Sequence, residues 1–284
     1  MGEYKTESKK VSVIMGVYNC ESTLEESIES IINQTYSNWE LIICDDGSSD
    51  RTYDIAQNYV FNYPDKIKLI KNEANLRLAA ALNRCLEYAN GEYVARMDGD
   101  DISLPERLEK QVAFLNSNPQ YQVVGAQMIS FDEIGDNGIR SVPEKPDKTY
   151  LRYTPPFAHA TIMMRKNAYD KLGGYRVDNE VTRCEDVDLW FRFFVEGFHG
   201  YNLQIPLYKV REGIKDFKRR KLAYAINTAK VCYKGYNLLG YPKRYYVFLL
   251  KPIIASLIPP KLMKYYHNVK DGRARNRYIF EKKG

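Results

Sequence analysis

Strands and helices alternate in the first hundred residues, and this alternation restricts the fold more than any other feature of the sequence. Four runs rich in β-branched or apolar residues predict strands, over residues 11–15, 41–44, 67–70 and 93–97. Apolar residues at helical spacing separate these runs, at Leu24–Ile32, Ile55–Val60 and Leu78–Cys85. Short connections between such units favour parallel strands with right-handed crossovers. We therefore predict an α/β fold with an open, mostly parallel sheet flanked by helices.

Capping residues mark the starts of two predicted helices. The stretch Ser22-Thr23-Leu24-Glu25 has the form of a capping box. Ser48, Ser49 and Asp50 are suited to cap the second helix. Beyond Asp101 the alternation loosens, although residues 104–116 still indicate a helix and residues 122–131 a strand. Residues 132–157 are rich in Pro, Gly and Asp, and we expect them to form a loop or an irregular excursion.

Charge is distributed unevenly along the chain. Residues 1–214 hold 24 Lys and Arg against 33 Asp and Glu, a net charge of −9, whereas residues 215–284 carry +15. This break predicts a polar N-terminal extension over residues 1–10, a main domain over 11–214 and a basic tail over 215–284. The tail is also rich in tyrosine and apolar residues over 241–260, and we expect it to form a helical appendage.

Several partners could suit a basic tail that is rich in tyrosine. Its apolar part is too short, and too interrupted by Lys251 and Pro252, to span a bilayer. It fits the headgroup region of an anionic membrane surface, which is the interpretation we favour. Packing on the main domain and binding of nucleic acid are the alternatives. The acidic main domain disfavours broad contact with nucleic acid.

Other sequence features indicate a cytoplasmic protein. The polar N-terminus has the pattern of neither a signal peptide nor a membrane anchor. The five cysteines form no C-x-x-C pair and are odd in number, which favours reduced thiols. Cys44 lies inside an apolar run and is expected in the core.

Two aspartates follow the fourth predicted strand, at Asp98 and Asp100. Carboxylates at positions i and i+2 of an extended segment leave it on the same side. Such a pair suits a hard divalent cation, Mn²⁺ or Mg²⁺, that keeps its other sites for water and phosphate. Ligands of α/β folds bind at the carboxyl ends of strands. The pair therefore predicts a metal that holds a diphosphate, with an acidic turn as the alternative.

A second acidic turn, which includes Asp45 and Asp46, follows the second predicted strand. One of these carboxylates could accept a hydrogen bond from a base or a ribose, but Asp-Gly-Ser is also ordinary turn chemistry. Because both acidic turns follow predicted parallel strands, we expect them to share one cleft. Neither a Walker A motif nor a G-x-G-x-x-G motif accompanies them, which argues against P-loop and Rossmann binding.

A third acidic group, Glu185 and Asp186, begins an apolar segment that indicates a buried helix. The helix dipole stabilises negative charge there, so we expect an ionised carboxylate that can act as a base. Complementarity between acidic residues and a helix N-terminus is the simpler alternative. His159 precedes another apolar segment, and a lone histidine is more often structural than catalytic. The three histidines lack the spacing of a zinc site.

These motifs occur together in a known family. The chain resembles a bacterial family 2 glycosyltransferase with the GT-A fold, over roughly residues 10–212. The resemblance is carried by residues 11–19, 30–36, 45–50, 80–83, 98–101 and 185–190, in the order usual for the family. Gly16 stands where the family often has Pro, and Arg77 where many members have Gly. The Q-x-x-R-W motif of processive synthases is absent, which predicts addition of one sugar per visit.

The resemblance implies a role for each matching residue. Gly16 and Tyr18 would line the base site. Asp46 would bind uracil, with Asp45 as its neighbour or as the alternate ligand, and Arg77 would lie near the base or diphosphate. Asp98 would reach the ribose or the metal, and Asp100 would hold the metal. Asp186 would be the general base. Glu185 and His159 complete the predicted substrate-binding set.

The resemblance also implies the reaction and its setting. It implies an inverting, metal-dependent enzyme that moves one sugar from a nucleotide sugar, most simply a UDP-sugar, to a lipid-linked or oligosaccharide acceptor in surface polysaccharide biosynthesis. Such an enzyme would act at the inner face of the bacterial cell membrane. The identity of the sugar, the acceptor and the linkage position would depend on a variable region, roughly residues 132–182. The alternatives are a non-catalytic binding protein for nucleotide sugar or nucleic acid, and a sugar nucleotidyltransferase. Residues 17–21 disfavour the nucleotidyltransferase, because they lack a Gly-rich basic loop.

Overall fold

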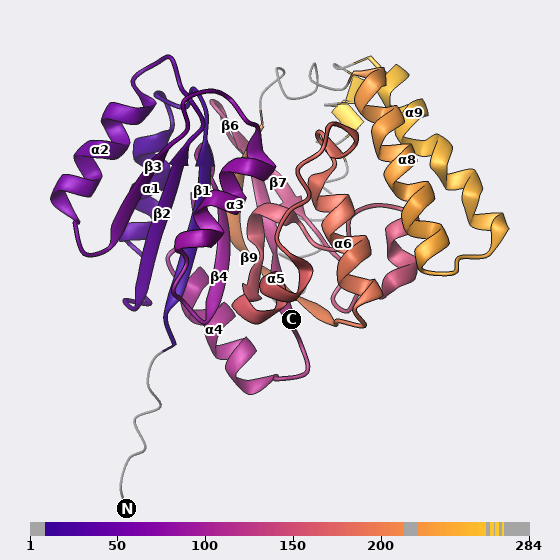
Figure 1. Cartoon of the computed structure of the whole chain (residues 1–284), viewed down its shortest axis with the longest axis horizontal. Coiled ribbons are helices and arrows are strands. Elements are labelled where there is room, and N and C mark those ends of the chain that lie inside the picture. The colour runs from indigo at the N-terminus through magenta and orange to yellow at the C-terminus, as the bar shows by residue number, and fades with distance from the viewer. Residues whose placement is uncertain (1–8, 213–220, 260–261, 264, 267–268, 270–284) are drawn as a thin grey trace, which may run out of the picture.

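Four parallel strands form one half of the sheet in the computed structural model (Figure 1). The strand β1 (Val11–Val17) lies between β2 (Trp39–Asp45) and β4 (Tyr93–Asp98), and β3 (Ile67–Lys71) lies outside β2. The predicted parallel α/β fold is confirmed. The structure describes residues 9–212, 221–259, 262–263, 265–266 and 269.

Strand directions are mixed in the other half of the sheet. There β6 (Val123–Asp132) pairs in parallel with β9 (Gly200–Arg211) and antiparallel with β8 (Met163–Arg165), which continues the sheet from β4. The short β5 (Ile102–Ser103) lies antiparallel to β9. The long β9, which comes late in the chain, therefore pairs with two earlier strands, β5 and β6.

The prediction of a loop over residues 132–157 is wrong in part. Residues Gly135–Arg140 form the strand β7, antiparallel to β6, and Lys148–Arg152 form a 3₁₀ turn, η1. The sequence of β7, Gly-Asp-Asn-Gly-Ile-Arg, has a low intrinsic preference for strands. Pairing with β6 forms this strand despite that preference.

Helices cover both faces of the parallel strands (Figure 1). Buried residues of α1 (Leu24–Ile32), α2 (Thr52–Asn62) and α4 (Arg107–Ser117) share one hydrophobic cluster with Val13. Buried residues of α3 (Leu78–Tyr88), α5 (Lys166–Leu172) and α6 (Glu185–Val195) share another with Ile14. Successive strand residues point to opposite faces, so neighbours on β1 serve different clusters. Each fully buried aliphatic side chain contributes about 1.5–3 kcal/mol.

The start of α1 differs from the predicted capping box. Its N-cap is Thr23 rather than Ser22, and no side chain caps it. The Thr23 hydroxyl instead donates to the carbonyl of Gly99 at 2.9 Å, and the Ser27 hydroxyl donates to the carbonyl of Asp101 at 2.7 Å. The polar side chains of α1 therefore fix the turn that follows β4, which is the turn that carries Asp100.

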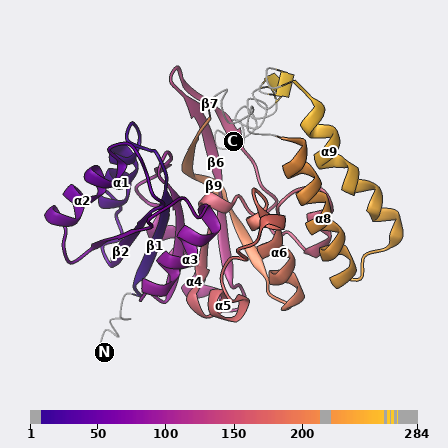
Figure 2. The same ribbon diagram turned by 45° about the horizontal axis from the view of Figure 1, so that its top comes forward.

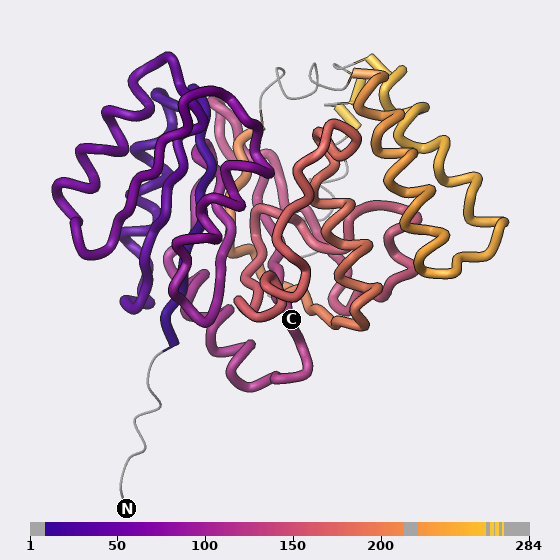
Figure 3. Tube along the Cα trace, in the orientation of Figure 1, coloured from indigo at the N-terminus to yellow at the C-terminus, as the bar shows by residue number. Residues whose placement is uncertain are grey.

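The C-terminal part is helical, as predicted, and packs on the main body. Its described elements are α8 (Leu222–Leu238), a 3₁₀ segment η4 (Lys243–Leu249) and α9 (Leu250–Leu257), which lie beyond α6 in Figures 2 and 3. A Cβ atom on Gly235 would lie 2.3 Å from the Phe191 ring, so only glycine allows this approach of α8 to α6. The proposed boundary at residue 214 lies outside the described residues, as does most of the predicted N-terminal extension.

Two further sequence predictions concern burial and hydropathy. All five cysteines are free thiols, and Cys44 is buried in the core as expected. Among the described residues, no helix combines the length and the apolar character that a bilayer crossing requires.

Candidate functional site

A pocket of about 720 Å³ opens where β1, β2 and β4 end. It is lined by residues from several predicted motifs, namely Gly16, Tyr18, Asp46, Arg77, Asp98, Asp100 and Glu185. Because β1 has β2 on one side and β4 on the other, the chain leaves the sheet in opposite directions on its two sides, and such switch points bind ligands in α/β folds. The expectation that the two acidic turns share one cleft is confirmed.

One side of the pocket consists of strand ends, and we call it the sheet wall: Gly16, Tyr18, Asp46, Asp98 and Asp100. The ladder fixes its register, since Gly16 pairs with Cys44 of β2 and with Asp98 of β4. A Cβ atom on Gly16 would lie 3.1 Å from the Cβ of Ala81, so glycine lets α3 approach β1 closely. Tyr18 follows β1 and is 46% exposed, which leaves its ring available for stacking on a ligand.

The Asp46 carboxylate holds the loop before α3. Its Oδ1 accepts from the Asn72 amide at 2.7 Å and from the Leu76 N–H at 2.9 Å, and its Oδ2 accepts from the Arg77 N–H at 2.7 Å. A carboxylate offers about four acceptor positions. Asp46 can therefore anchor this loop and still accept one further hydrogen bond from a ligand.

Arg77 has an unusual backbone conformation. Its φ is 75° and its ψ is 164°, a region that essentially only glycine occupies without strain. Its guanidinium donates to Asn179 Oδ1 at 3.2 Å and to Thr182 Oγ1 at 2.5 Å. Arg77 therefore ties the loop before α3 to residues on the opposite side of the pocket.

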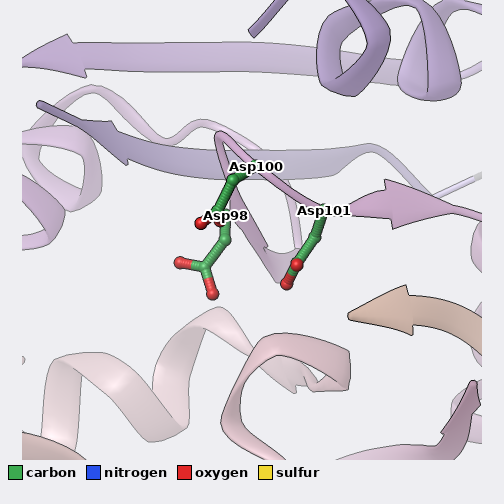
Figure 4. Close-up of side chains that lie close together, drawn as sticks. All are labelled: Asp98, Asp100 and Asp101. Carbon is green, nitrogen blue, oxygen red and sulfur yellow. The ribbon is translucent and has the colours of Figure 1, made fainter. Parts of the chain in front are cut away.

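Three aspartates converge at the end of β4. One oxygen from each of Asp98, Asp100 and Asp101 lies within 4.8 Å of the others, and Figure 4 shows the three side chains close together. The sequence pattern indicated Asp98 and Asp100 but not Asp101. The run Asp98-Gly99-Asp100-Asp101 was the one sequence feature that could have indicated Asp101. Neighbouring side chains of an extended strand point in opposite directions, so Asp101 was not expected beside Asp100. The turn after β4 brings it there.

The aspartate group has the properties of a site for a hard divalent cation. Asp101 is buried, and its Oδ2 has no hydrogen-bond partner in the described structure, whereas its Oδ1 accepts from the Arg211 N–H at 2.8 Å. Burial, with Asp98 and Asp100 nearby, raises the pKa of Asp101 well above its usual value. Carboxylate oxygens are the ligands that Mg²⁺ and Mn²⁺ prefer. The three carboxylates therefore fit such an ion, and the charge of the ion would offset the repulsion between them.

A buried arginine orients the first aspartate of this group. Arg96 is 5% exposed and forms a two-pronged ion pair with Asp98, in which Nη1 lies 2.6 Å from Oδ2. Paired guanidinium and carboxylate groups are geometrically specific as well as strong. The backbone N–H of Asp98 also donates to the Tyr208 hydroxyl at 3.2 Å. Asp98 is thus held in place from two directions.

The opposite side of the pocket, which we call the helix wall, consists of residues 176–183 without Glu180, together with Glu185 and Tyr224. Arg176 organises it, with Nη2 3.0 Å from Asp178 Oδ2 and 3.1 Å from Glu180 Oε2. The Asn227 amide of α8 donates to the Asn179 carbonyl at 3.0 Å. Only Glu185 of this wall was predicted from the sequence, since no motif signals a wall that is assembled from a loop and the tail.

Glu185 and Asp186 begin α6, but they differ in position. Glu185 lines the pocket, whereas Asp186 is half-buried and is not among the lining residues. Burial raises the pKa of the Asp186 carboxyl, although the Val187 N–H and the charge of Arg96 act against this. Burial and the neighbouring Asp186 likewise raise the pKa of Glu185. The expectation of an ionised carboxylate at this helix N-terminus did not include the effect of burial, which acts in the opposite direction.

Two other predicted residues do not line the pocket. Asp45 is fully buried, and its Oδ2 accepts from the Ser48 N–H at 3.3 Å. His159 lies in the 3₁₀ turn η2 (His159–Thr161), where its Nε2 lies 2.8 Å from the Tyr175 hydroxyl. Burial, together with the charge of Arg96, lowers the pKa of His159 well below 6.5, which favours the neutral ring. Both residues support the pocket from behind in this structure.

Known proteins include relatives of this chain. The sequence profile described as Glycosyl transferase family 2 matches residues 12–173. The chain is 54% identical to EpsE of Bacillus subtilis, which is named as a glycosyltransferase, over 91% of this chain and 93% of EpsE. It is 36% identical to WfgD of Escherichia coli, over 52% of this chain and 65% of WfgD. WfgD is named as a UDP-Glc:α-D-GlcNAc-diphosphoundecaprenol β-1,3-glucosyltransferase.

A solved structure supports the fold independently. S. aureus TarS 1-349 in complex with UDP superposes with a TM-score of 0.64 at 20% identity, over 90% of this chain and 78% of TarS 1-349. At this identity the likeness concerns the fold alone.

Proposed function

The chain belongs to glycosyl transferase family 2 and is a glycosyltransferase, and from that premise we propose that it transfers a single sugar from a UDP-sugar with inversion. The proposed acceptor is a hydroxyl of a lipid-linked sugar, or of an oligosaccharide, in surface polysaccharide biosynthesis. The name of WfgD includes both a UDP-sugar and a lipid diphosphate, which supports this choice. We also propose residues 11–214 as the transferase domain and 215–284 as a membrane-associated tail.

The sheet wall would bind the nucleotide. Tyr18 would stack on the base, where Gly16 leaves room, and the remaining acceptor position of Asp46 would take the N–H of uracil. Asp45 would support Asp46 from behind. Arg77 would lie over the bound nucleotide, because its guanidinium reaches across the pocket to Thr182.

The aspartates after β4 would bind the metal ion. Asp100 and Asp98 would hold Mn²⁺ or Mg²⁺, with Asp101 as a third carboxylate. When bound, the ion would supply Lewis-acid stabilisation of the leaving diphosphate. Arg96 would keep Asp98 in one orientation, since its guanidinium already contacts both carboxylate oxygens.

The start of α6, next to the helix wall, would activate the acceptor. Asp186 would accept the proton of the acceptor hydroxyl, and the oxygen would attack the anomeric carbon from the face opposite the diphosphate. The carbon–oxygen bond to the diphosphate would break as the new bond forms, so the anomeric configuration inverts. Burial raises the pKa of Asp186, which makes it a stronger base once it is ionised. Glu185 would contact the acceptor or the transferred sugar, because it lines the pocket.

One observation carries the proposal: Asp46 lines the same pocket as Asp98 and Asp100. The parallel pairing of β1 with β2 and with β4 brings these strand ends together. Calorimetry of UDP binding with and without Mn²⁺ tests it. We expect binding that depends on Mn²⁺, after which a panel of UDP-sugars would identify the donor. Absence of binding under both conditions would contradict a UDP-sugar donor and would direct the search to dTDP or GDP.

The described tail supports a location at the membrane surface. Leu250, Ile254 and Leu257 form an exposed stripe along α9, each at least 53% exposed. Lys243 and Arg244 lie at the start of η4 and are exposed. Exposed apolar residues beside cations suit the headgroup region of an anionic membrane. We propose that the tail holds the enzyme at the inner face of the cell membrane.

Co-sedimentation with lipid vesicles tests this location. The full chain should pellet with vesicles that contain anionic lipid, and should do so less with neutral vesicles. A chain that lacks residues 240–284 should lose this preference. Equal binding to both kinds of vesicle, or an unchanged preference after the deletion, would contradict the proposal.

A further inference from the structure

An open groove of about 340 Å³ lies along α8, outside the pocket described above. Its apolar lining comes from Ile226, Ala229 and Tyr233 of α8 and from Ile253 of α9. The three α8 residues recur at spacings of three and four, which places them on one stripe of the helix. Ile226 is 40% and Tyr233 is 52% exposed, so the stripe faces solvent rather than the core. An exposed apolar stripe that lines a groove is a candidate binding surface.

Two lysines of α8 border this groove. Lys234 pairs with Glu180 at 2.5 Å, and Glu180 also pairs with Arg176 at 3.1 Å. Lys230 is exposed, and no ion pair of Lys230 is found among the described residues. A cation without a carboxylate partner beside an apolar stripe suits an amphiphile with an anionic head.

The groove adjoins the pocket through the 3₁₀ turn η3 (Asn179–Val181). Asn179 lines the pocket, and the next residue, Glu180, lines the groove. Consecutive Cα atoms are about 3.8 Å apart. The first turns of α8 separate the two in the same way, with Tyr224 in the pocket and Ile226 in the groove. In Figure 2, α8 lies between α6 and α9, and this one helix contributes residues to both the pocket and the groove.

We propose that this groove binds the hydrocarbon chain of a lipid-diphosphate sugar, the acceptor of the reaction. The diphosphate would lie beside Lys230 and Lys234, and the sugar would reach past η3 to the helix wall. This inference rests on the proposed function and adds to it the place where the acceptor binds. A single chain fits better than a membrane surface, since a volume of about 340 Å³ is within the range of small-molecule sites.

The test compares two anionic probes that differ in their hydrocarbon chain, farnesyl diphosphate and inorganic diphosphate. Binding to the full chain is measured by calorimetry with UDP and Mn²⁺ at saturating concentration, so that the diphosphate heads cannot occupy the pocket. Farnesyl diphosphate is kept below the concentration at which it aggregates. We expect it to bind at least about tenfold more tightly, because burial of its chain is favourable.

Three variants locate the binding. Ile226→Asp should reduce the preference for farnesyl diphosphate to below about twofold, because it introduces a charge into the apolar stripe. Lys230→Glu should weaken the binding of both probes by a similar factor. Leu238→Asp is the matched control, since Leu238 is on the same helix, 66% exposed and outside the lining of the groove. UDP binding should be unchanged in all three, which also shows that each variant is folded.

The outcomes separate this inference from the proposed function. A preference that survives Ile226→Asp, or that Leu238→Asp removes as effectively, would overturn the groove as the binding site. The second result would indicate diffuse association with apolar surface. If UDP fails to bind the unmodified chain, the proposed donor is wrong. If UDP binds and no preference for the farnesyl chain exists, only the inference about the groove is wrong.

Discussion

The two walls of the pocket are built by different means. In the sheet wall, the register of three parallel strands sets the relative positions of Gly16, Asp46 and Asp98, and backbone hydrogen bonds hold them. In the helix wall, side chains provide much of the support, chiefly the ion pairs of Arg176 and the bond from Asn227 to the Asn179 carbonyl. Backbone hydrogen bonds between strands recur along the whole length of a strand and together hold the sheet wall firmly. A half-exposed ion pair contributes little to stability, so the helix wall is held less firmly.

This difference indicates a division of labour. A wall set by strand register suits a ligand whose shape is constant, such as a nucleotide diphosphate. A wall held by side chains can change its residues without disturbing the sheet, which suits a variable acceptor. Variants in each wall test this division, with effects that should decrease from the proton acceptor to the residues that lie behind the walls.

The largest effect is expected for the proposed proton acceptor at the start of α6. Asp186→Asn should lower the rate of sugar transfer by about 10²-fold or more, the usual worth of general-base catalysis, with UDP binding retained. Glu185→Gln is the matched variant, because Glu185 is adjacent and lines the pocket. Transfer rates and UDP affinities of both should be measured. Near-normal transfer by Asp186→Asn, with the loss in Glu185→Gln instead, would reassign the base.

The next effect concerns the sheet wall. Asp100→Asn should weaken UDP binding in the presence of Mn²⁺ by about 10- to 100-fold and leave metal-free binding unchanged, because the amide is a poorer ligand for the ion. Calorimetry with and without Mn²⁺ measures this. Asp65→Asn is a suitable control, since Asp65 is exposed and does not line the pocket. Metal dependence equal to that of the unmodified chain would remove Asp100 from the metal site.

A smaller effect is expected at Arg77, which ties the two walls. Arg77→Gly removes the backbone strain, whereas Arg77→Ala retains it, and both lose the bonds to Asn179 and Thr182. The glycine variant should therefore be more stable than the alanine variant by about 1 kcal/mol or more. Urea unfolding of the two variants measures this difference. Equal stabilities would show that the conformation at residue 77 is not strained.

The smallest effect should come from His159, behind the helix wall. Its pKa is lowered in the folded chain, so below about pH 6.5 the unfolded chain binds a proton that the folded chain does not. The contribution of neutral His159 to the free energy of unfolding should be fully present above pH 6.5. It should decrease as the pH is lowered from there towards the pKa of His159 in the folded chain. His159→Gln should flatten this part of the curve, measured by urea unfolding between pH 5 and pH 8. His199→Gln, at an exposed position, should leave it unchanged.

The same division explains what could be predicted from the sequence. The parallel strands and their order along the chain followed from apolar runs, and Asp46, Asp98 and Asp100 from the polar residues directly after them. Gly16 and Tyr18 followed only from the resemblance to the family. The helix wall did not follow from the sequence, because Arg176 and Tyr224 belong to no local pattern and meet only through packing of α8 on η3 and α6. Asp101 was missed since its position depends on the turn after β4. The strand β7 was missed because pairing with β6 overrides its own preference.

The position of α8 near the C-terminal end of the sequence has a consequence for synthesis of the chain. All four parallel strands lie within residues 11–98, yet Tyr224 and the groove beside it come more than one hundred residues later. The partner of the Asp98 N–H, the Tyr208 hydroxyl, is also synthesised late. A nascent or prematurely terminated chain thus carries the strands of the sheet wall without the helix wall. Incomplete translation products should sequester nucleotide at most, and should leave the acceptor pool untouched.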